Sequence, residues 1–327
     1  MRDSFGRRID YLRLSLTDRC DLRCTYCMAE RPTFLPRDDL LTIEELDRVA
    51  TAFIRLGVRK LRLTGGEPLV RKGAIDLVAA LARHLRSGSL DELTLTTNGS
   101  QLAQYADQLA KAGVERINVS LDHLDPLRFA AITRGGVLQR TLDGIDAAQA
   151  AGIKVKINTV VLGSDNLDHI PDLIFWAHSK QMPVTLIEVM PVGDIGADRL
   201  AQHVPMPVAR AAIEARWPLA DFALRTGGPA RYARTAAGGI VGFITPLTAN
   251  FCEGCNRVRV SADGRLHACL GHETAVDLKP ALRKSEDDAM LEREVGHLLA
   301  IKPARHNFEI GGTTQASVRR AMSVTGG

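Results

Sequence analysis

The sequence is poor in three features that mark particular classes of protein. It has no apolar run of the roughly 18–20 residues that cross a bilayer, so we expect no membrane span. Aromatic residues make up 5% of the 327 residues, and the formal net charge is +4. Sparse aromatics argue against stacking platforms for single-stranded nucleic acid, and a mild charge does not demand a nucleic acid. We therefore expect neither a membrane nor a nucleic acid as a partner.

Cysteines are also few, and they are absent from most of the chain. The six form two groups of three: Cys20, Cys24 and Cys27, then Cys252, Cys255 and Cys269. We find no signal peptide, because Met1 to Gly6 is polar and Arg13 interrupts the first apolar stretch, so we expect a cytoplasmic protein. Cytosolic thiols are ligands or catalysts more often than disulfides. The two groups therefore predict two metal sites with three thiolates each.

Strand-like and helix-like stretches alternate from residue 9 to about residue 190. The expected strands, rich in Val, Ile, Leu and Thr, are Ile9–Leu16, Arg59–Thr64, Glu92–Thr97, Arg116–Leu121, Lys154–Leu162 and Val184–Met190. Amphipathic helices are expected at Thr42–Leu56, Ala74–Arg86, Gln101–Ala112, Thr141–Ala151 and Leu167–Ser179. Six such repeats predict an α/β fold: a parallel sheet curled into an incomplete (βα)6 TIM-like barrel.

After Met190 the alternation stops, and we place a domain boundary there. Residues 1–190 form the barrel domain, and residues 191–327 form a connecting region and a C-terminal α+β extension that carries the second cysteine group. In this part we expect a helix, a hairpin and two further helices, at Val208–Arg216, Arg257–Ser261 with Arg265–Ala268, Asp277–Lys284 and Asp288–Ile301.

Unusual residues follow five of the predicted strands at their C-terminal ends, where sheets of this kind bind ligands. They are Cys20–Cys27, Gly65–Pro68, Asn98-Gly99, Asp122 and Met190. Gly, Pro, Asn and Asp mark turns anywhere, which would explain any single loop. Five such loops on one face indicate a ligand site.

The first cysteine group has the spacing C-x3-C-x2-C, from Cys20 to Cys27, in the loop after the first strand. Soft thiolates at this spacing can hold one metal site. Zinc is one alternative, although a structural zinc usually has a fourth protein ligand. The spacing favours a [4Fe-4S] cluster, in which three thiolates leave one iron open for chemistry.

This loop, with Tyr26 just before its third cysteine, resembles the signature of the radical S-adenosylmethionine enzymes. Gly65-Gly66-Glu67-Pro68 resembles their second motif, which pairs with the methionine amino group. The resemblance implies that Cys20, Cys24 and Cys27 hold a cluster that cleaves S-adenosylmethionine. It further implies that the cofactor is held by Tyr26, Gly65, Gly66, Glu67, Ser120 and Met190.

The second cysteine group has the spacing C-x2-C-x13-C. A structural zinc with a fourth ligand from elsewhere is one alternative, and His267 and His272 lie nearby. Three cysteines again favour a cluster with one open iron, outside the β/α core.

Both groups together resemble the radical enzymes that cyclise GTP in the first step of molybdenum cofactor biosynthesis. The matching stretches are Ser15–Cys20, Arg62–Gly66, Thr96–Gly99, Arg116–Asp122, Lys156–Asn158, Cys255–Arg259 and the terminal Gly326-Gly327. The resemblance implies that GTP is bound by Arg13, Arg62, Thr96, Lys156, Arg257 and Arg259. It places Arg257, Arg259, Gly326 and Gly327 in the active site with Cys20, Cys24 and Cys27, and it implies that Cys252, Cys255 and Cys269 hold the second cluster.

The resemblance also implies the cofactors and partners. The cofactors are two [4Fe-4S] clusters and S-adenosylmethionine. The partners are GTP, an external electron donor and a downstream cyclic pyranopterin monophosphate synthase, and the chain is a monomer or a homodimer. Two alternatives remain: a radical S-adenosylmethionine enzyme whose auxiliary cluster serves a peptide substrate, and a non-catalytic redox or zinc-binding module.

Overall fold

A computed structural model describes residues 1–196, 198–309 and 316–326. The strands are β1 (Tyr11–Ser15), β2 (Lys60–Thr64), β3 (Glu92–Thr97), β4 (Arg116–Ser120), β5 (Lys154–Val161), β6 (Val184–Glu188), β7 (Leu219–Phe222), β8 (Arg231–Thr235), β9 (Ile240–Ile244), β10 (Arg257–Val260), β11 (Arg265–His267) and β12 (Ala275–Asp277). They form one sheet in the order β12-β11-β10-β1-β2-β3-β4-β5-β6-β9-β8-β7.

The α-helices of the described residues are α1 (Ile43–Arg55), α2 (Ala74–Arg86), α3 (Leu102–Lys111), α4 (Pro126–Thr133), α5 (Leu138–Ala150), α6 (Gly163–Asn166), α7 (Ile170–Ser179), α8 (Arg199–Gln202), α9 (Met206–Glu214), α10 (Lys279–Lys284), α11 (Ala289–Ala300) and α12 (Met322–Thr325). None of these helices is long and apolar enough to cross a membrane.

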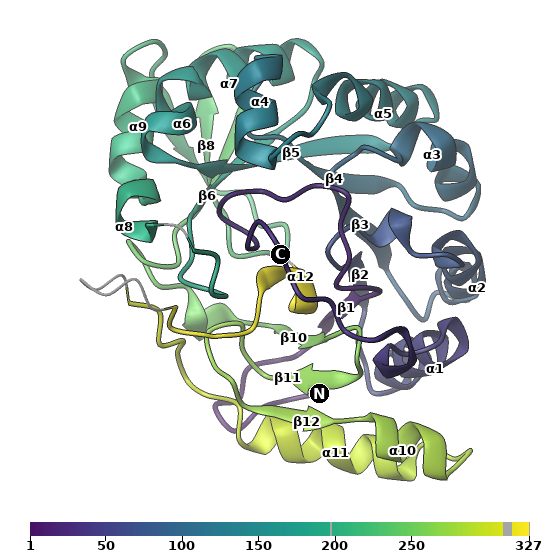
Figure 1. The fold of residues 1–327 in the computed structure, drawn as a ribbon. Coiled ribbons are helices and arrows are strands. Elements are labelled where there is room, and N and C mark those ends of the chain that lie inside the picture. Colours follow the sequence, from purple (N-terminus) through teal and green to yellow (C-terminus); the bar gives the residue numbers. More distant parts are fainter. Residues whose placement is uncertain (197, 310–315, 327) are drawn as a thin grey trace.

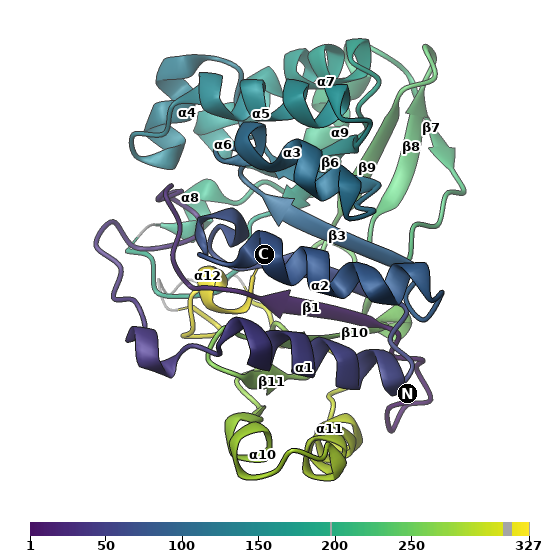
Figure 2. The same ribbon diagram turned by 90° about the vertical axis from the view of Figure 1, so that its right-hand side faces the viewer.

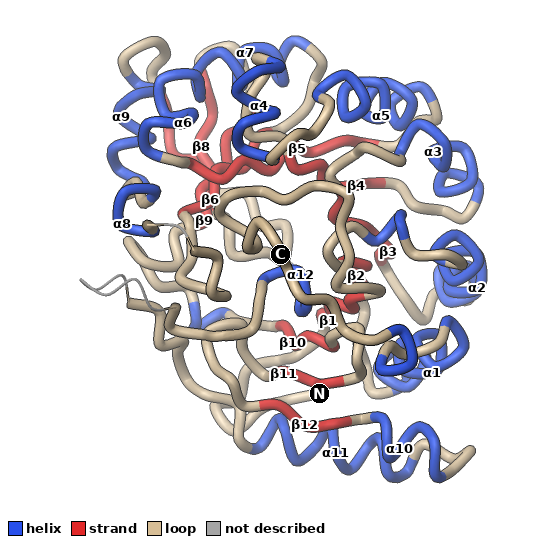
Figure 3. Tube along the Cα trace, in the orientation of Figure 1, coloured by secondary structure: helices blue, strands red, loops and turns tan. Residues whose placement is uncertain are grey.

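The strands β1 to β6 are parallel and curve into an arc, with α1, α2, α3, α5 and α7 along its outer side (Figures 1 and 2). The two ends of the sheet, β12 and β7, do not pair with each other in the described residues. The predicted fold, an incomplete (βα)6 TIM-like barrel, is therefore confirmed. Figure 3 shows that loops, and not helices, cover most of the near end of the barrel.

Local sequence signals explain several element boundaries. α1 begins with a capping box, in which Glu45 N donates to Thr42 Oγ1 at 3.1 Å and Thr42 N donates to a Glu45 carboxylate oxygen at 2.9 Å. It ends just before Gly57, whose φ of +98° is a conformation that few other residues adopt. The buried side chains of α1, such as Leu46 and Phe53, pack against the outer face of the sheet.

The C-terminal half departs from the sequence prediction in one respect that matters for the site. The strand after the second cysteine group, β10, pairs in parallel with β1, and β9 pairs in parallel with β6. The predicted C-terminal extension, outside the six β/α units, is confirmed, and its strand β10 extends the sheet at the β1 edge, so the second cysteine group lies directly beside the barrel. The domain boundary at residue 190 stays a prediction.

Several elements were not predicted from the sequence, among them β7, β8 and α4. β7 and β8 lie in the stretch read as a connecting region, where Gly227, Gly228 and Pro229 obscure the pattern of an exposed edge hairpin. α4 is short and follows Asp125, whose carboxylate caps the helix by accepting from Leu127 N and Arg128 N. The hairpin of β10 and β11 and the helices α9, α10 and α11 were predicted to within about two residues of their ends.

Candidate active site

The first cysteine loop lies at the C-terminal end of β1 and is fastened to the loop after β2. Gly66 N donates to Thr17 O at 2.7 Å, and Glu67 N donates to Arg19 O at 2.8 Å. A side chain on Gly66 would place its Cβ 2.3 Å from Arg19 O. The glycine therefore lets the two loops approach closely, which fixes the start of the segment that carries Cys20.

The thiols of this loop lie in surroundings that disfavour a free thiolate. Burial, followed by the nearby carboxylates of Glu67 and Asp122, raises the pKa values of Cys20 and Cys24, and burial and Asp122 raise the pKa of Cys27 to about 11. A bound metal centre has to supply the positive charge that stabilises these thiolates. Two N–H groups already point to Cys20 Sγ, from Leu22 N at 3.4 Å and Asn98 Nδ2 at 3.7 Å.

Two buried carboxylates brace this end of the barrel. Glu67 accepts hydrogen bonds from Leu69 N at 3.0 Å, Thr97 Oγ1 at 2.8 Å and Asn98 N at 2.6 Å, so it ties the loop after β2 to the end of β3. Burial raises the pKa of Glu67 to about 7.

Asp122 links the first cysteine loop to β5 in a similar way. Its carboxylate accepts from the Tyr26 hydroxyl at 2.8 Å and from Val160 N at 2.9 Å, and burial raises its pKa to about 6. Asp122 therefore fixes the ring of Tyr26, a residue predicted to hold the cofactor. Ser120 ends β4 opposite Asn158, and Met190 lies two residues after β6.

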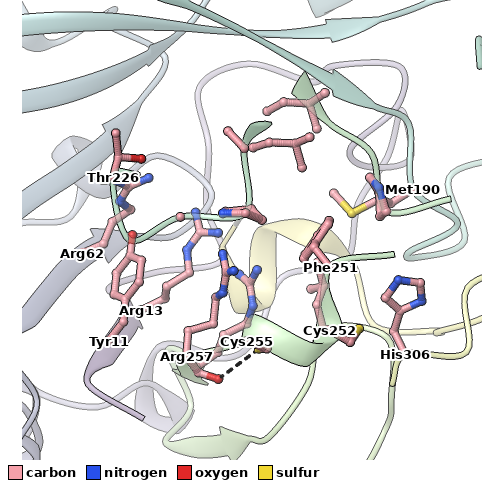
Figure 4. Close-up of a pocket in the computed structure, with 18 of the residues that line it drawn as sticks. Tyr11, Arg13, Arg62, Met190, Thr226, Phe251, Cys252, Cys255, Arg257 and His306 are labelled. Carbon is pink, nitrogen blue, oxygen red and sulfur yellow. Dashed lines mark hydrogen bonds between the residues drawn. The ribbon is translucent and has the colours of Figure 1, made fainter. Parts of the chain in front are cut away.

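A cavity inside the barrel brings together most of the residues predicted for the substrate (Figure 4). Its lining includes Arg13, Arg62, Lys156, Arg257, Arg259 and Met190. All three cysteines of the second group also line it. Arg13 stands in register between Arg62 on β2 and Arg259 on β10, so three guanidinium groups lie on adjacent strands.

The cavity is strongly cationic. Burial and the neighbouring guanidinium groups lower the pKa of Arg259 to about 10, and burial and Arg62 lower that of Lys156 to about 7. Among the described residues, Arg62, Lys156, Arg257 and Arg259 make no salt bridge with a carboxylate. By contrast, Lys60 and Arg116 at the edge of the same cavity both pair with Glu92. The arrangement is suited to a ligand with several negative charges.

Thr96 does not line this cavity but stands in register with Asn118, which does. The hydroxyl of Thr96 and the side-chain oxygens of Asn118 and Asn158 are buried without a hydrogen-bond partner in the described part of the chain. Buried polar atoms without partners are uncommon, so these three mark places where a polar ligand would bind.

The second cysteine group lies among cations. Burial raises the pKa of Cys255, but Lys302 and Arg257 outweigh it, so the pKa of this thiol lies below its usual value. Burial keeps the pKa of Cys269 above its usual value, although Lys302 opposes it. Cys255 Sγ also approaches Arg257 O at 3.9 Å (Figure 4).

Comparisons with known proteins agree with this geometry. Residues 14–177 match the model of the Radical SAM superfamily, and residues 182–308 match the model described as Molybdenum Cofactor Synthesis C. The GTP 3′,8-cyclases of Nitrobacter winogradskyi and Rhodopseudomonas palustris are 59% and 60% identical to this chain, over all of it and 96% of each relative. The chain belongs to the GTP 3′,8-cyclase family of radical SAM enzymes.

Solved structures show the same fold at low sequence identity. Streptococcus suis SuiB bound to its precursor peptide SuiA has a TM-score of 0.62 and 16% identity, covering 88% of this chain and 66% of that one. SuiB bound to S-adenosylmethionine has a TM-score of 0.57 and 16% identity, covering 97% of this chain and 75% of that one. At such identity the likeness concerns the fold alone.

Membership of the GTP 3′,8-cyclase family confirms the predicted cofactors, two [4Fe-4S] clusters and S-adenosylmethionine. The donor set fits clusters, because all six cysteines are free, the first three lie on one loop and the last three line one cavity. In the described residues, no three His, Cys, Asp or Glu side chains converge as the ligands of one metal ion would. Thiolates that each bind a different iron of a cubane need not converge in this way. Of the histidines considered for zinc, His272 directs Nε2 to Arg305 O at 2.9 Å.

The C-terminal tail enters the barrel, as Figure 1 shows for α12. Gly326 O accepts a hydrogen bond from Arg259 Nη1 at 2.5 Å, and a Cβ on Gly326 would lie 2.0 Å from Thr64 Oγ1. Only glycine fits between the end of β2 and this guanidinium group. Gly327, also predicted for the active site, lies outside the described residues.

Four residues that shape these sites were not predicted from the sequence. Asp122 and Asn98 were noted at strand ends without a role, so their signal was available. Arg320, which donates to Cys269 O, and Lys302, which donates to Arg257 O and Ala268 O beside the cysteines, lie outside any recognisable motif. Only the folded chain brings these two side chains to the cysteines.

Proposed function

We propose that this chain converts GTP to (8S)-3′,8-cyclo-7,8-dihydroguanosine 5′-triphosphate, a lyase reaction that begins molybdenum cofactor biosynthesis. The observation that carries the proposal is the cationic cavity bordered by the second cysteine group, in a chain about 60% identical to GTP 3′,8-cyclases over its full length. GTP carries roughly four negative charges, which the cations of this cavity can balance.

Within the cavity, we assign the triphosphate to Arg13, Arg62 and Lys156, whose side chains project from β1, β2 and β5. Charge-assisted hydrogen bonds from guanidinium groups are strong and directional, so they fix the orientation of the nucleotide as well as its affinity. Thr96 lies beside the cavity, in register with Asn118, and its hydroxyl, which has no hydrogen-bond partner among the described residues, supports a further polar contact through that neighbour. The barrel wall around these residues excludes water from the reacting atoms.

We assign the first cluster to Cys20, Cys24 and Cys27 and the second to Cys252, Cys255 and Cys269. Tyr26, Gly65, Gly66, Glu67, Ser120 and Met190 are assigned to the S-adenosylmethionine site. When bound, the first cluster and S-adenosylmethionine would supply the radical chemistry needed to activate C3′ of GTP.

The chain's own residues position the reactants. Asp122 holds the hydroxyl of Tyr26, and Glu67 holds the loop after β2 against the third strand. Arg259 lines the cavity and donates to Gly326 O, which supports a position for the tail at the active site. Arg257 lies on the same strand, two residues closer to Cys255. In radical enzymes the protein mainly binds and orients the reactants, while the cofactor supplies the chemistry.

The partners are proposed on the same basis. The electron comes from an external donor, and the product passes to a cyclic pyranopterin monophosphate synthase in the cytoplasm. Support comes from the match of residues 182–308 to the Molybdenum Cofactor Synthesis C model. A monomer or a homodimer remains the prediction for the assembly.

An anaerobic assay tests the proposal. The reconstituted protein, with dithionite and S-adenosylmethionine, is offered GTP, ATP or a mixed peptide pool, and 5′-deoxyadenosine and modified substrate are identified by mass spectrometry. We expect one 5′-deoxyadenosine for each cyclised GTP and no cyclised ATP. Modification of a peptide with no cyclised GTP would instead identify a peptide-modifying enzyme.

A further inference from the structure

Lys302 is a buried cation placed against the second cysteine group. It lies two residues after Ala300, the last residue of α11, and its relative exposure is 2%. Its ammonium group donates to Arg257 O at 3.2 Å and to Ala268 O. Ala268 precedes Cys269, and Arg257 follows Cys255 by two residues. One side chain therefore bridges the two segments that carry two of the three cysteines.

Two other cations hold the same cysteine group by its main chain, and both are neutralised. Arg7 Nη1 donates to Cys252 O at 2.9 Å, and its guanidinium group pairs with Asp3 at 2.6 Å. Arg320 Nη2 donates to Cys269 O at 3.1 Å, and its guanidinium group pairs with Glu273 at 2.9 Å.

Lys302 differs from both. Within residues 1–196, 198–309 and 316–326 it makes no salt bridge with a carboxylate, and its ammonium group donates to two neutral carbonyl groups. A buried ammonium group without a counter-charge is costly, so buried charges are normally paired. Ala268 adjoins Cys269 and Arg257 is two residues from Cys255, so the ammonium group lies against the segments that carry the thiolates of the second cysteine group.

We infer that Lys302 is the buried counter-charge of the second cluster and that it raises the cluster's reduction potential. Three thiolates give an oxidised [4Fe-4S]²⁺ cluster a net charge of −1, and uptake of one electron makes it −2. A cation held close by in a poorly solvated site stabilises the reduced form more than the oxidised one. Lys302 therefore acts on the cluster as a positioned charge rather than as a ligand.

The inference rests on the second cluster, a cofactor of the family, and not on GTP as the substrate. It is therefore tested without turnover. A failure to cyclise GTP would leave the reduction potential measurable, so the two proposals fail separately.

The experiment is a potentiometric titration followed by electron paramagnetic resonance on Lys302→Met, Lys302→Arg and Arg7→Met. Each is made in the full chain with Cys20, Cys24 and Cys27 replaced by Ala, so that the signal comes from the second cluster. The titration is repeated with all six cysteines present, where addition of S-adenosylmethionine marks the signal of the first cluster. Iron and sulfide content are measured on every variant.

At a fixed potential, we expect the reduced-to-oxidised ratio of the second cluster to fall about tenfold in Lys302→Met, ~59 mV for a one-electron couple. Lys302→Arg keeps the positive charge, and Arg7→Met removes a charge that Asp3 already neutralises. In both variants the reduced-to-oxidised ratio should therefore stay within about twofold of the parent. Loss of the second cluster in Lys302→Met but not in Lys302→Arg would also support the charge role. An unchanged ratio in Lys302→Met overturns the inference. So does a shift or a cluster loss in Lys302→Arg as large as in Lys302→Met.

Discussion

The two cysteine groups contain the same number of thiols but lie in opposite electrostatic surroundings. Around the first, Glu67 and Asp122 are the charged neighbours that most disfavour the thiolates, whereas around the second, Lys302 and Arg257 favour the thiolate of Cys255. S-adenosylmethionine carries a sulfonium and a net positive charge, and GTP is a polyanion. The surroundings of each group therefore suit the charge of the ligand that we propose beside it.

The largest expected effect comes from breaking one group at a time. Cys24→Ala removes a ligand of the first cluster and Cys255→Ala one of the second, so each variant should lose about four irons and keep the other cluster. Cys255→Ala should still cleave S-adenosylmethionine but form no cyclised GTP, whereas Cys24→Ala should do neither. Iron content and 5′-deoxyadenosine, measured together, check this. If Cys255→Ala still cyclised GTP, the second cysteine group would not be part of the active site.

The buried carboxylate of Glu67, beside the first cysteine group, predicts that the stability of the fold depends on pH. The pKa of Glu67 is raised by burial to about 7 from an ordinary 4.5, so the folded state binds this proton more tightly than the unfolded chain. Glu67 therefore contributes to the free energy of unfolding at low pH. This contribution falls by about 3 kcal/mol as the pH rises from about 4.5 to about 7. Glu67→Gln imitates the protonated form and should remove that loss.

Urea unfolding of the cluster-free protein between pH 4.5 and 8 measures the difference between the wild type and Glu67→Gln. The gap in unfolding free energy should widen in favour of the variant as pH rises. A constant gap across this range would show that Glu67 does not titrate there and that its carboxylate keeps its charge when buried.

The first cysteine group and the second differ in how far the sequence predicts them. The spacing of Cys20, Cys24 and Cys27 predicts a local site, because one loop carries all three ligands. The surroundings of the second group are assembled from distant segments: Arg7 at the start of the chain, Lys302 after α11, and β10 inserted beside β1. Periodicity reports what each segment prefers, but strand order across the sheet depends on packing that no local pattern contains.

The cationic cavity beside the second cysteine group predicts that two of its arginines contribute unequally to GTP binding. Arg62 makes no salt bridge with a carboxylate in the described residues, whereas Arg116 pairs with Glu92. Arg62→Gln should weaken GTP binding by about 2 kcal/mol, ~30-fold, through loss of a charge-assisted hydrogen bond. Arg116→Gln should weaken it less than about fivefold, because Glu92 already offsets its charge. Anaerobic calorimetry with GTP measures both, and equal losses would contradict the assignment.

The smallest expected effect concerns the joint between the second cysteine group and the tail. Arg320 donates to Cys269 O at 3.1 Å and to His272 O at 2.6 Å, so it fastens the segment leading into α12 to the cysteine loop. Arg320→Gln should loosen α12 by about 1 kcal/mol, ~5-fold faster amide exchange there, while the strands keep their protection. Arg319→Gln is the matched control, since that side chain is exposed. Hydrogen exchange read by mass spectrometry distinguishes them, and equal exchange in α12 for both variants would mean that Arg259 and Gly326 hold the tail without Arg320.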